Sequence, residues 1–187
     1  MATFVLVHGA WHGGWCWEEI VPLLEHDGHR VIAPDLPGMG RDRTPLSSIT
    51  LAGWADFVAD LIRAEPEPVI LVGHSRGGIV ISEVAERVPE RIRRLVYLAA
   101  FLPPSGATLR SLSAQSKAPR NAGMMVMSED GATSTVATNL AGAIFYNTTD
   151  AATIERAATR LTPEPMVTFV TPVQLTEARF GSVPRAY

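Results

Sequence analysis

Near its middle the chain reads Val69-Ile70-Leu71-Val72-Gly73-His74-Ser75-Arg76-Gly77-Gly78. The continuous apolar run at its start predicts a strand buried on both faces, as in a parallel sheet. Residues 77–88, closed by Pro89, predict a helix. The G-x-S-x-G motif therefore falls on a strand-to-helix turn, which strains the serine backbone and accepts only small residues at Gly73 and Gly77. We predict that Ser75 is a nucleophile; the alternative is a simple tight turn.

The same alternation of strand and helix continues on both sides of this turn. The other predicted strands are residues 3–7, 29–33 and 95–98, and the other predicted helices are residues 15–24 and 51–64. Thr50 is the expected N-cap of the last of these helices. Strands that alternate with helices indicate an α/β fold with a mostly parallel sheet and helices on both faces.

The composition changes after the fourth predicted strand. Ser, Thr, Ala, Met and Pro dominate up to Pro172, and no buried strand stands out, although residues 150–161 have a helical pattern. We expect residues 1–101 and 173–187 to form the core and residues 102–172 to form a helical cap or lid inserted over it. The alternative is that this insertion is a small helical surface segment with no part in substrate binding.

A second motif, His8-Gly9-Ala10, follows the first predicted strand and lies beside the serine turn in a doubly wound sheet. An acyl-transfer site needs two amide donors near the oxyanion, one from the residue after the serine and one from a neighbouring loop. We expect the backbone N–H groups of Ala10 and Arg76 to be these donors. The substrate pocket is expected to include five further residues, namely His8, Gly9, Trp11, Phe101 and Leu102. The alternative is that His8-Gly9 only turns the chain.

Three segments together resemble one branch of the α/β-hydrolase family. They are Phe4-Val5-Leu6-Val7-His8-Gly9-Ala10-Trp11-His12-Gly13-Gly14-Trp15, the Gly-His-Ser-x-Gly-Gly turn, and Arg179-Phe180-Gly181-Ser182-Val183. This branch contains plant methylesterases, salicylate-binding esterase, hydroxynitrile lyases and similar bacterial esterases. The resemblance implies an α/β-hydrolase core with a cap, no cofactor, and Ser75 attacking an ester carbonyl.

The catalytic triad is where the sequence departs from this family. The family order is Ser, Asp, His, but all five histidines, His8, His12, His26, His29 and His74, precede Ser75. We weigh His8 and His74 as weak substitutes for the missing base and expect His12 to hold its loop by hydrogen bonds. Without a base, a serine is a poor nucleophile at neutral pH. We therefore expect the chain to be part of a longer protein. The last strand and helix of the sheet, together with the triad Asp and His, would come from the rest of that protein or from a second polypeptide.

The composition and net charge of the chain limit the kinds of molecule that it is expected to bind. The 187 residues carry a formal net charge of -3, which disfavours nucleic acid and anionic membranes. No apolar run is long enough for a transmembrane helix, and residues 1–16 lack a signal-peptide pattern. The single cysteine, Cys16, excludes an internal disulfide and a multi-cysteine metal site. We expect a cytoplasmic protein with no metal and a small-molecule substrate.

Our leading hypothesis is a serine esterase that hydrolyses small carboxylic esters through an acyl-enzyme on Ser75. One alternative is a hydroxynitrile lyase on the same scaffold, but the plant lyases carry a threonine where this chain has Gly9. Gly9 offers no hydroxyl to a substrate alcohol, which favours the esterase. The other alternative is a noncatalytic binding module that keeps the pocket and lacks the triad base.

Overall fold

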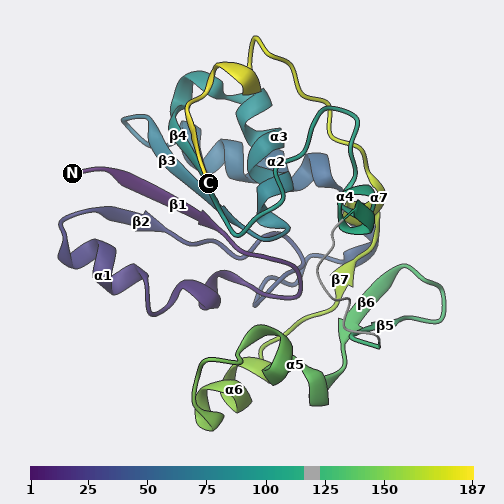
Figure 1. Cartoon of the computed structure of the whole chain (residues 1–187). Coiled ribbons are helices and arrows are strands. Elements are labelled where there is room, and N and C mark those ends of the chain that lie inside the picture. Colours follow the sequence, from purple (N-terminus) through teal and green to yellow (C-terminus); the bar gives the residue numbers. More distant parts are fainter. Residues whose placement is uncertain (116–122) are drawn as a thin grey trace.

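A five-stranded parallel sheet forms the centre of the protein, with strand order β2-β1-β3-β4-β8 (Figure 1). The computed structural model describes residues 1–115 and 123–187. The strands are β1 Thr3–Val7, β2 Arg30–Ile32, β3 Val69–His74, β4 Ile92–Leu98 and β8 Arg185–Ala186. The predicted α/β class and parallel sheet are confirmed.

Helices cover both faces of this sheet, and the alternation of side chains along each strand explains why both faces are apolar. Val5, Val7 and Leu71 point to one face and pack in the core with α2 (Leu51–Arg63) and α3 (Gly77–Arg87). Leu6 and Val72 point to the other face and pack with the 3-10 turn at Gly14–Trp17 and with α1 (Val21–His26). Burial on both faces is what the continuous apolar runs predict.

One of two predicted helices forms in the structure as expected, and the other does not. Helix α2 forms as expected, and the Thr50 hydroxyl caps it by accepting a hydrogen bond from the Gly53 amide at 2.9 Å. The continuous helix predicted over residues 15–24 is wrong, because the structure divides it into a 3-10 turn and the separate α1. Pro22 explains the division, since proline is tolerated in the first turn of a helix and not in its interior.

The chain between β4 and β8 contains a small antiparallel sheet in addition to helices. Its elements are α4 Leu109–Gln115, β5 Met125–Met127, β6 Thr133–Val136, α5 Thr138–Phe145, α6 Ala151–Ala158, β7 Glu164–Pro165 and α7 Val167–Val170. Strands β5, β6 and β7 pair in that order, which the expectation of a purely helical insertion did not include. These strands are two to four residues long, and β5 is exposed, so they carry no buried apolar run.

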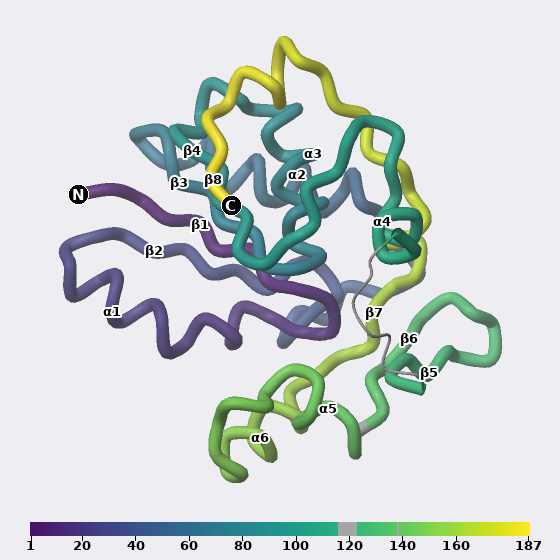
Figure 2. The backbone as a smooth tube through the Cα atoms, viewed as in Figure 1, coloured from purple at the N-terminus to yellow at the C-terminus, as the bar shows by residue number. Residues whose placement is uncertain are grey.

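The last segment of the chain returns to the sheet along α3 (Figure 2). Glutamates on α3 hold it: Glu83 accepts a hydrogen bond from the Gln174 amide at 2.9 Å, and Glu86 accepts one from the Thr176 amide at 2.8 Å. This path brings β8 beside β4 in parallel register. Within the described part of the chain, no helix is long and apolar enough to cross a membrane.

Candidate active site

Ser75 lies on a sharp turn between β3 and α3, with a backbone φ of 53° in the left-handed region. This conformation is uncommon for a residue other than glycine and is typical of functional positions. The two flanking glycines allow it. A Cβ on Gly73 would lie 2.7 Å from the carbonyl oxygen of Gly77, and a Cβ on Gly77 would lie 2.7 Å from that of Val7. The backbone therefore packs so closely around Ser75 that no larger residue fits at either glycine.

Ser75 lines a cavity of about 700 Å³. Its walls are mostly aromatic rings and methionines from the loop after β1, the end of β4 and the segment between β4 and β8. These residues are Trp11, Phe101, Phe145, Phe169, Met124, Met125, Met127 and Met166. Ala10 and Arg76 also line the cavity, and Arg110 and Ser113 add polar groups. The structure thus brings Ser75, Ala10, Trp11, Arg76 and Phe101 together, as the sequence analysis expected.

Three residues expected in the pocket do not line this cavity in the described structure. His8 is fully buried behind the loop: its Nδ1 bonds to the Gly9 carbonyl at 2.9 Å, and its Nε2 accepts the Leu36 amide at 3.2 Å. Burial, followed by the nearby Arg76 charge, lowers its pKa well below the usual value, so this imidazole stays neutral. Gly9 packs against the back of the turn, and the Leu102 side chain is 45% exposed.

Two backbone amides that line the Ser75 cavity have no hydrogen-bond acceptor in the described part of the chain. Neither the Ala10 N–H nor the Arg76 N–H donates a hydrogen bond to any residue in the described ranges. Both residues line the cavity with Ser75. An oxyanion hole would need backbone donors of this kind at one cavity with a serine.

His12 holds the same loop against the segment between β4 and β8, so the prediction for this residue is confirmed. Its Nδ1 bonds to the Ala10 carbonyl at 2.7 Å, and its Nε2 bonds to the Tyr146 hydroxyl at 2.8 Å. A carbonyl can only accept, so Nδ1 carries the proton, and Nε2 accepts from the tyrosine O–H. Burial lowers the pKa of His12 to about 4 and so keeps the neutral form.

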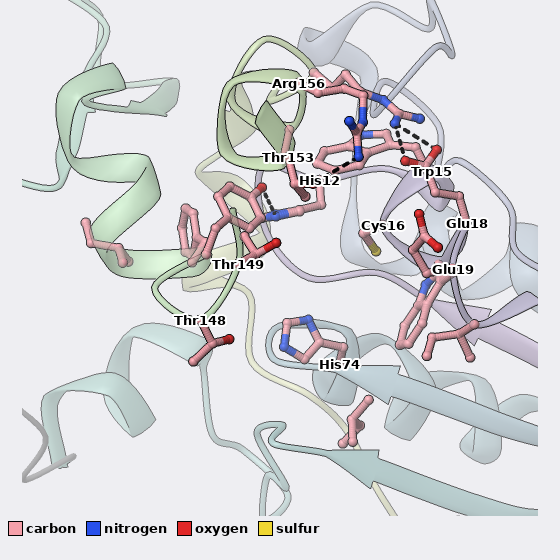
Figure 3. A pocket seen from close by; sticks show the side chains of 18 residues that line it. His12, Trp15, Cys16, Glu18, Glu19, His74, Thr148, Thr149, Thr153 and Arg156 are labelled. Carbon is pink, nitrogen blue, oxygen red and sulfur yellow. Dashed lines mark hydrogen bonds and ion pairs between the residues drawn. The ribbon is translucent and has the colours of Figure 1, made fainter. Parts of the chain in front are cut away.

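A second cavity of about 500 Å³ shares Phe145 with the first, and Ser75 is not among the residues that line it (Figure 3). Its lining includes His74, Cys16 and Glu18, and also Thr148 and Thr149. Burial lowers the pKa of His74 and raises that of the Cys16 thiol to about 12. His74 therefore faces a different cavity from the serine that follows it.

Glu164 contacts the serine turn and was not among the residues expected at the site. Its carboxylate is fully buried and forms an ion pair with Arg76, with 3.1 Å between Oε1 and the Arg76 Nε. The one signal in the sequence is an acidic residue between two prolines in a mostly apolar stretch, Pro163-Glu164-Pro165-Met166. Among the described residues, no group of three or more His, Cys, Asp or Glu side chains could hold a metal ion.

A family model matches nearly the whole chain, and curated relatives match a little more than half of it. The family model described as "Alpha/beta hydrolase family" matches residues 4–187. A carbendazim hydrolyzing esterase from Nocardioides sp. (strain SG-4G) is 50% identical over 115 residues, which are 60% of this chain and 47% of that protein. Methylesterase 1 from Arabidopsis thaliana is 45% identical over 104 residues, which are 54% of this chain and 40% of that protein.

Solved structures show the same fold. The crystal structure of tomato methylketone synthase I complexed with 2-tridecanone has a TM-score of 0.87 and 27% identity to this chain, and the match covers 98% of this chain and 76% of the tomato protein. The matched regions span less than half the length of the two curated relatives above. With the serine turn, the parallel sheet and the family match over residues 4–187, the chain belongs to the alpha/beta hydrolase family.

Proposed function

We propose that this protein is a serine hydrolase that cleaves small carboxylic esters through an acyl-enzyme on Ser75. The observation that carries the proposal is the placement of Ser75, which lies in a left-handed turn at the wall of an apolar cavity. Two amides that also line this cavity have no acceptor among the described residues. In this mechanism the Ser75 oxygen attacks the ester carbonyl. The amides of Ala10 and Arg76 stabilise the tetrahedral oxyanion, and its collapse expels the alcohol; water then releases the acid.

The proton acceptor for Ser75 comes, in this proposal, from outside these 187 residues. His8 and His12 have both ring nitrogens engaged in hydrogen bonds, and His74 lines the other cavity. His26 ends α1 and His29 precedes β2, both on the opposite side of the sheet from α3. A histidine with its carboxylate partner, on a further segment of the protein or on a second polypeptide, would complete the triad.

The residues that line the cavity support a proposal for the substrate class. Aromatic rings and flexible methionines suit an apolar or aromatic acyl group, and methionine adapts to irregular shapes. In this proposal residues 102–172 form the cap that covers the substrate, since Met124, Phe145 and Phe169 come from that segment. The single cysteine is compatible with a reducing, cytoplasmic location.

The lyase alternative is disfavoured by the space at Gly9. A Cβ there would lie 3.1 Å from the His74 Nδ1 and 3.2 Å from the Ser75 Cβ, so a threonine side chain would crowd the serine. A threonine here would require these two neighbouring side chains to shift, and Gly9 itself supplies no hydroxyl of the kind that the plant lyases carry.

The test compares the full-length wild-type protein with Ser75→Ala on methyl esters, p-nitrophenyl esters and carbendazim. We expect kcat to fall by on the order of a thousandfold or more in the variant. A fluorophosphonate should label the wild type and not Ser75→Ala. Equal hydrolysis by both proteins would refute the proposal. Cyanide release from mandelonitrile without ester hydrolysis would favour the lyase, and no labelling of the wild type would favour a noncatalytic binding module.

A further inference from the structure

The Arg76–Glu164 ion pair joins the serine turn to β7, 88 positions apart in the sequence (76 to 164). The two side chains are 1% and 0% exposed. Taking two charges out of water is costly, and an apolar pair of similar volume is often as stable or more stable. Fold stability alone therefore does not explain why this pair lies beside the catalytic serine.

The contacts of the pair converge on the two residues that flank Ala10. The Arg76 Nη2 donates a hydrogen bond to the Gly9 carbonyl at 3.1 Å. The Glu164 Oε2 accepts a hydrogen bond from the Trp11 amide at 2.9 Å. One member of the pair thus holds the peptide group before Ala10 and the other holds the one after it, while the Ala10 amide donates no hydrogen bond within residues 1–115 and 123–187.

Aromatic packing and burial surround the pair. The Arg76 guanidinium stacks over the Trp54 ring, with its Cζ 4.3 Å from the ring centroid. Burial raises the pKa of Glu164 and lowers the pKa of Arg76. In each case the charge of the other member of the pair acts in the opposite direction and favours the ionised form. Removing either partner would leave the other charge buried without compensation.

We propose that the Arg76 side chain and Glu164 are positioning residues that aim the Ala10 amide at the oxyanion of the reaction. This inference rests on the proposed function, because it assigns the pair to the same hydrolytic site. The consequence is that the geometry of the oxyanion hole depends on the segment between β4 and β8. Strand β7 must lie against the loop after β1 for Glu164 to reach the Trp11 amide.

The first experiment measures kcat, KM and the affinity for phenylboronic acid, which forms a tetrahedral adduct on serine, in full-length Glu164→Gln and Glu164→Ala. Glu164→Gln keeps an acceptor for the Trp11 amide and loses the charge, and Glu164→Ala loses both. We expect kcat to fall about tenfold and about hundredfold respectively, with KM changed by less than about threefold, since misplacing an oxyanion donor affects the transition state more than the bound substrate. Boronate affinity should fall by the same factors.

A double substitution separates positioning from stability. In Arg76→Met with Glu164→Leu, the buried pair is replaced by apolar groups, so thermal stability should recover to near the wild-type value. If the pair positions the hole, kcat and boronate affinity stay low in this stable variant. Recovery of both to wild-type values would overturn the inference, because the pair would then be needed only for folding.

A matched control is the exposed ion pair between Arg160 and Glu18, with 2.7 Å between Nη1 and Oε1. It also joins the cap segment to the chain after β1, but it does not touch residues 9–11. Glu18→Gln should keep kcat within about twofold of wild type. A loss equal to that of Glu164→Gln would overturn the inference in favour of general cap attachment.

Ser75→Ala distinguishes the two proposals. If it abolishes hydrolysis while Glu164→Gln and Glu164→Ala keep wild-type kcat and boronate affinity, the proposed function stands and this inference fails. If Ser75→Ala hydrolyses esters at the wild-type rate, the proposed function fails, and the inference fails with it. If Glu164→Ala does not fold, Glu164→Gln and the double variant decide.

Discussion

Acid should destabilise this protein through His12, which the fold holds in its neutral form. The imidazole is 8% exposed and joins the Ala10 carbonyl to the Tyr146 hydroxyl. Its pKa is lowered from 6.5 to about 4, chiefly by burial. Because the folded pKa lies below the unfolded one, the unfolded chain takes up the proton first as pH falls.

The size of the effect follows from that shift. The contribution of His12 to stability is complete above pH 6.5 and is lost as pH falls toward 4. At about 1.36 kcal/mol for each pKa unit, the whole loss is about 3 kcal/mol, with about 2.5 kcal/mol of it occurring between about pH 7 and about pH 4.5. This is a large share of the stability of a typical domain.

Urea denaturation of the wild type and of His12→Gln at these two pH values measures the loss. The other buried histidines titrate in both proteins, so the difference between the two losses isolates His12. We expect the wild type to lose about 2.5 kcal/mol more than the variant. NMR titration of the His12 ring supplies an independent check, with the proton expected on Nδ1. Equal losses in the two proteins, or a ring that titrates near 6.5, would refute the reasoning.

Substitutions at two positions and one chemical modification test other features of the fold. Gly73→Ala places a Cβ 2.7 Å from the Gly77 carbonyl oxygen, and urea denaturation should show a loss of about 1–3 kcal/mol. Thr50→Ala removes the α2 cap that accepts the Gly53 amide and should cost about 1 kcal/mol, while Thr50→Ser should cost less. The Cys16 thiol, whose pKa is raised to about 12, should react with iodoacetamide at about pH 8 more than about a hundredfold slower in the folded protein than in urea. Fast reaction in the fold would contradict the burial of Cys16.

The antiparallel sheet shows where local patterns stop being informative. Strand β7 is the dipeptide Glu164–Pro165, and its partner β6 begins about thirty residues earlier, at Thr133. Neither has a period-2 apolar pattern long enough to be recognised. Pairing across such a distance depends on the loops between them, so the sequence could not indicate it.

The amino-acid sequence alone determined the parallel sheet, the serine turn and the family. These features are local: a buried strand needs only its own apolar residues, and the turn around Ser75 needs only glycines two positions away on each side. Only the tertiary structure decided which groups serve the site. It enclosed His8 in hydrogen bonds, turned His74 toward a separate cavity, and brought Glu164 to Arg76. The physical reason is that burial and charge pairing depend on which distant segments meet, and the identity of a residue does not specify that.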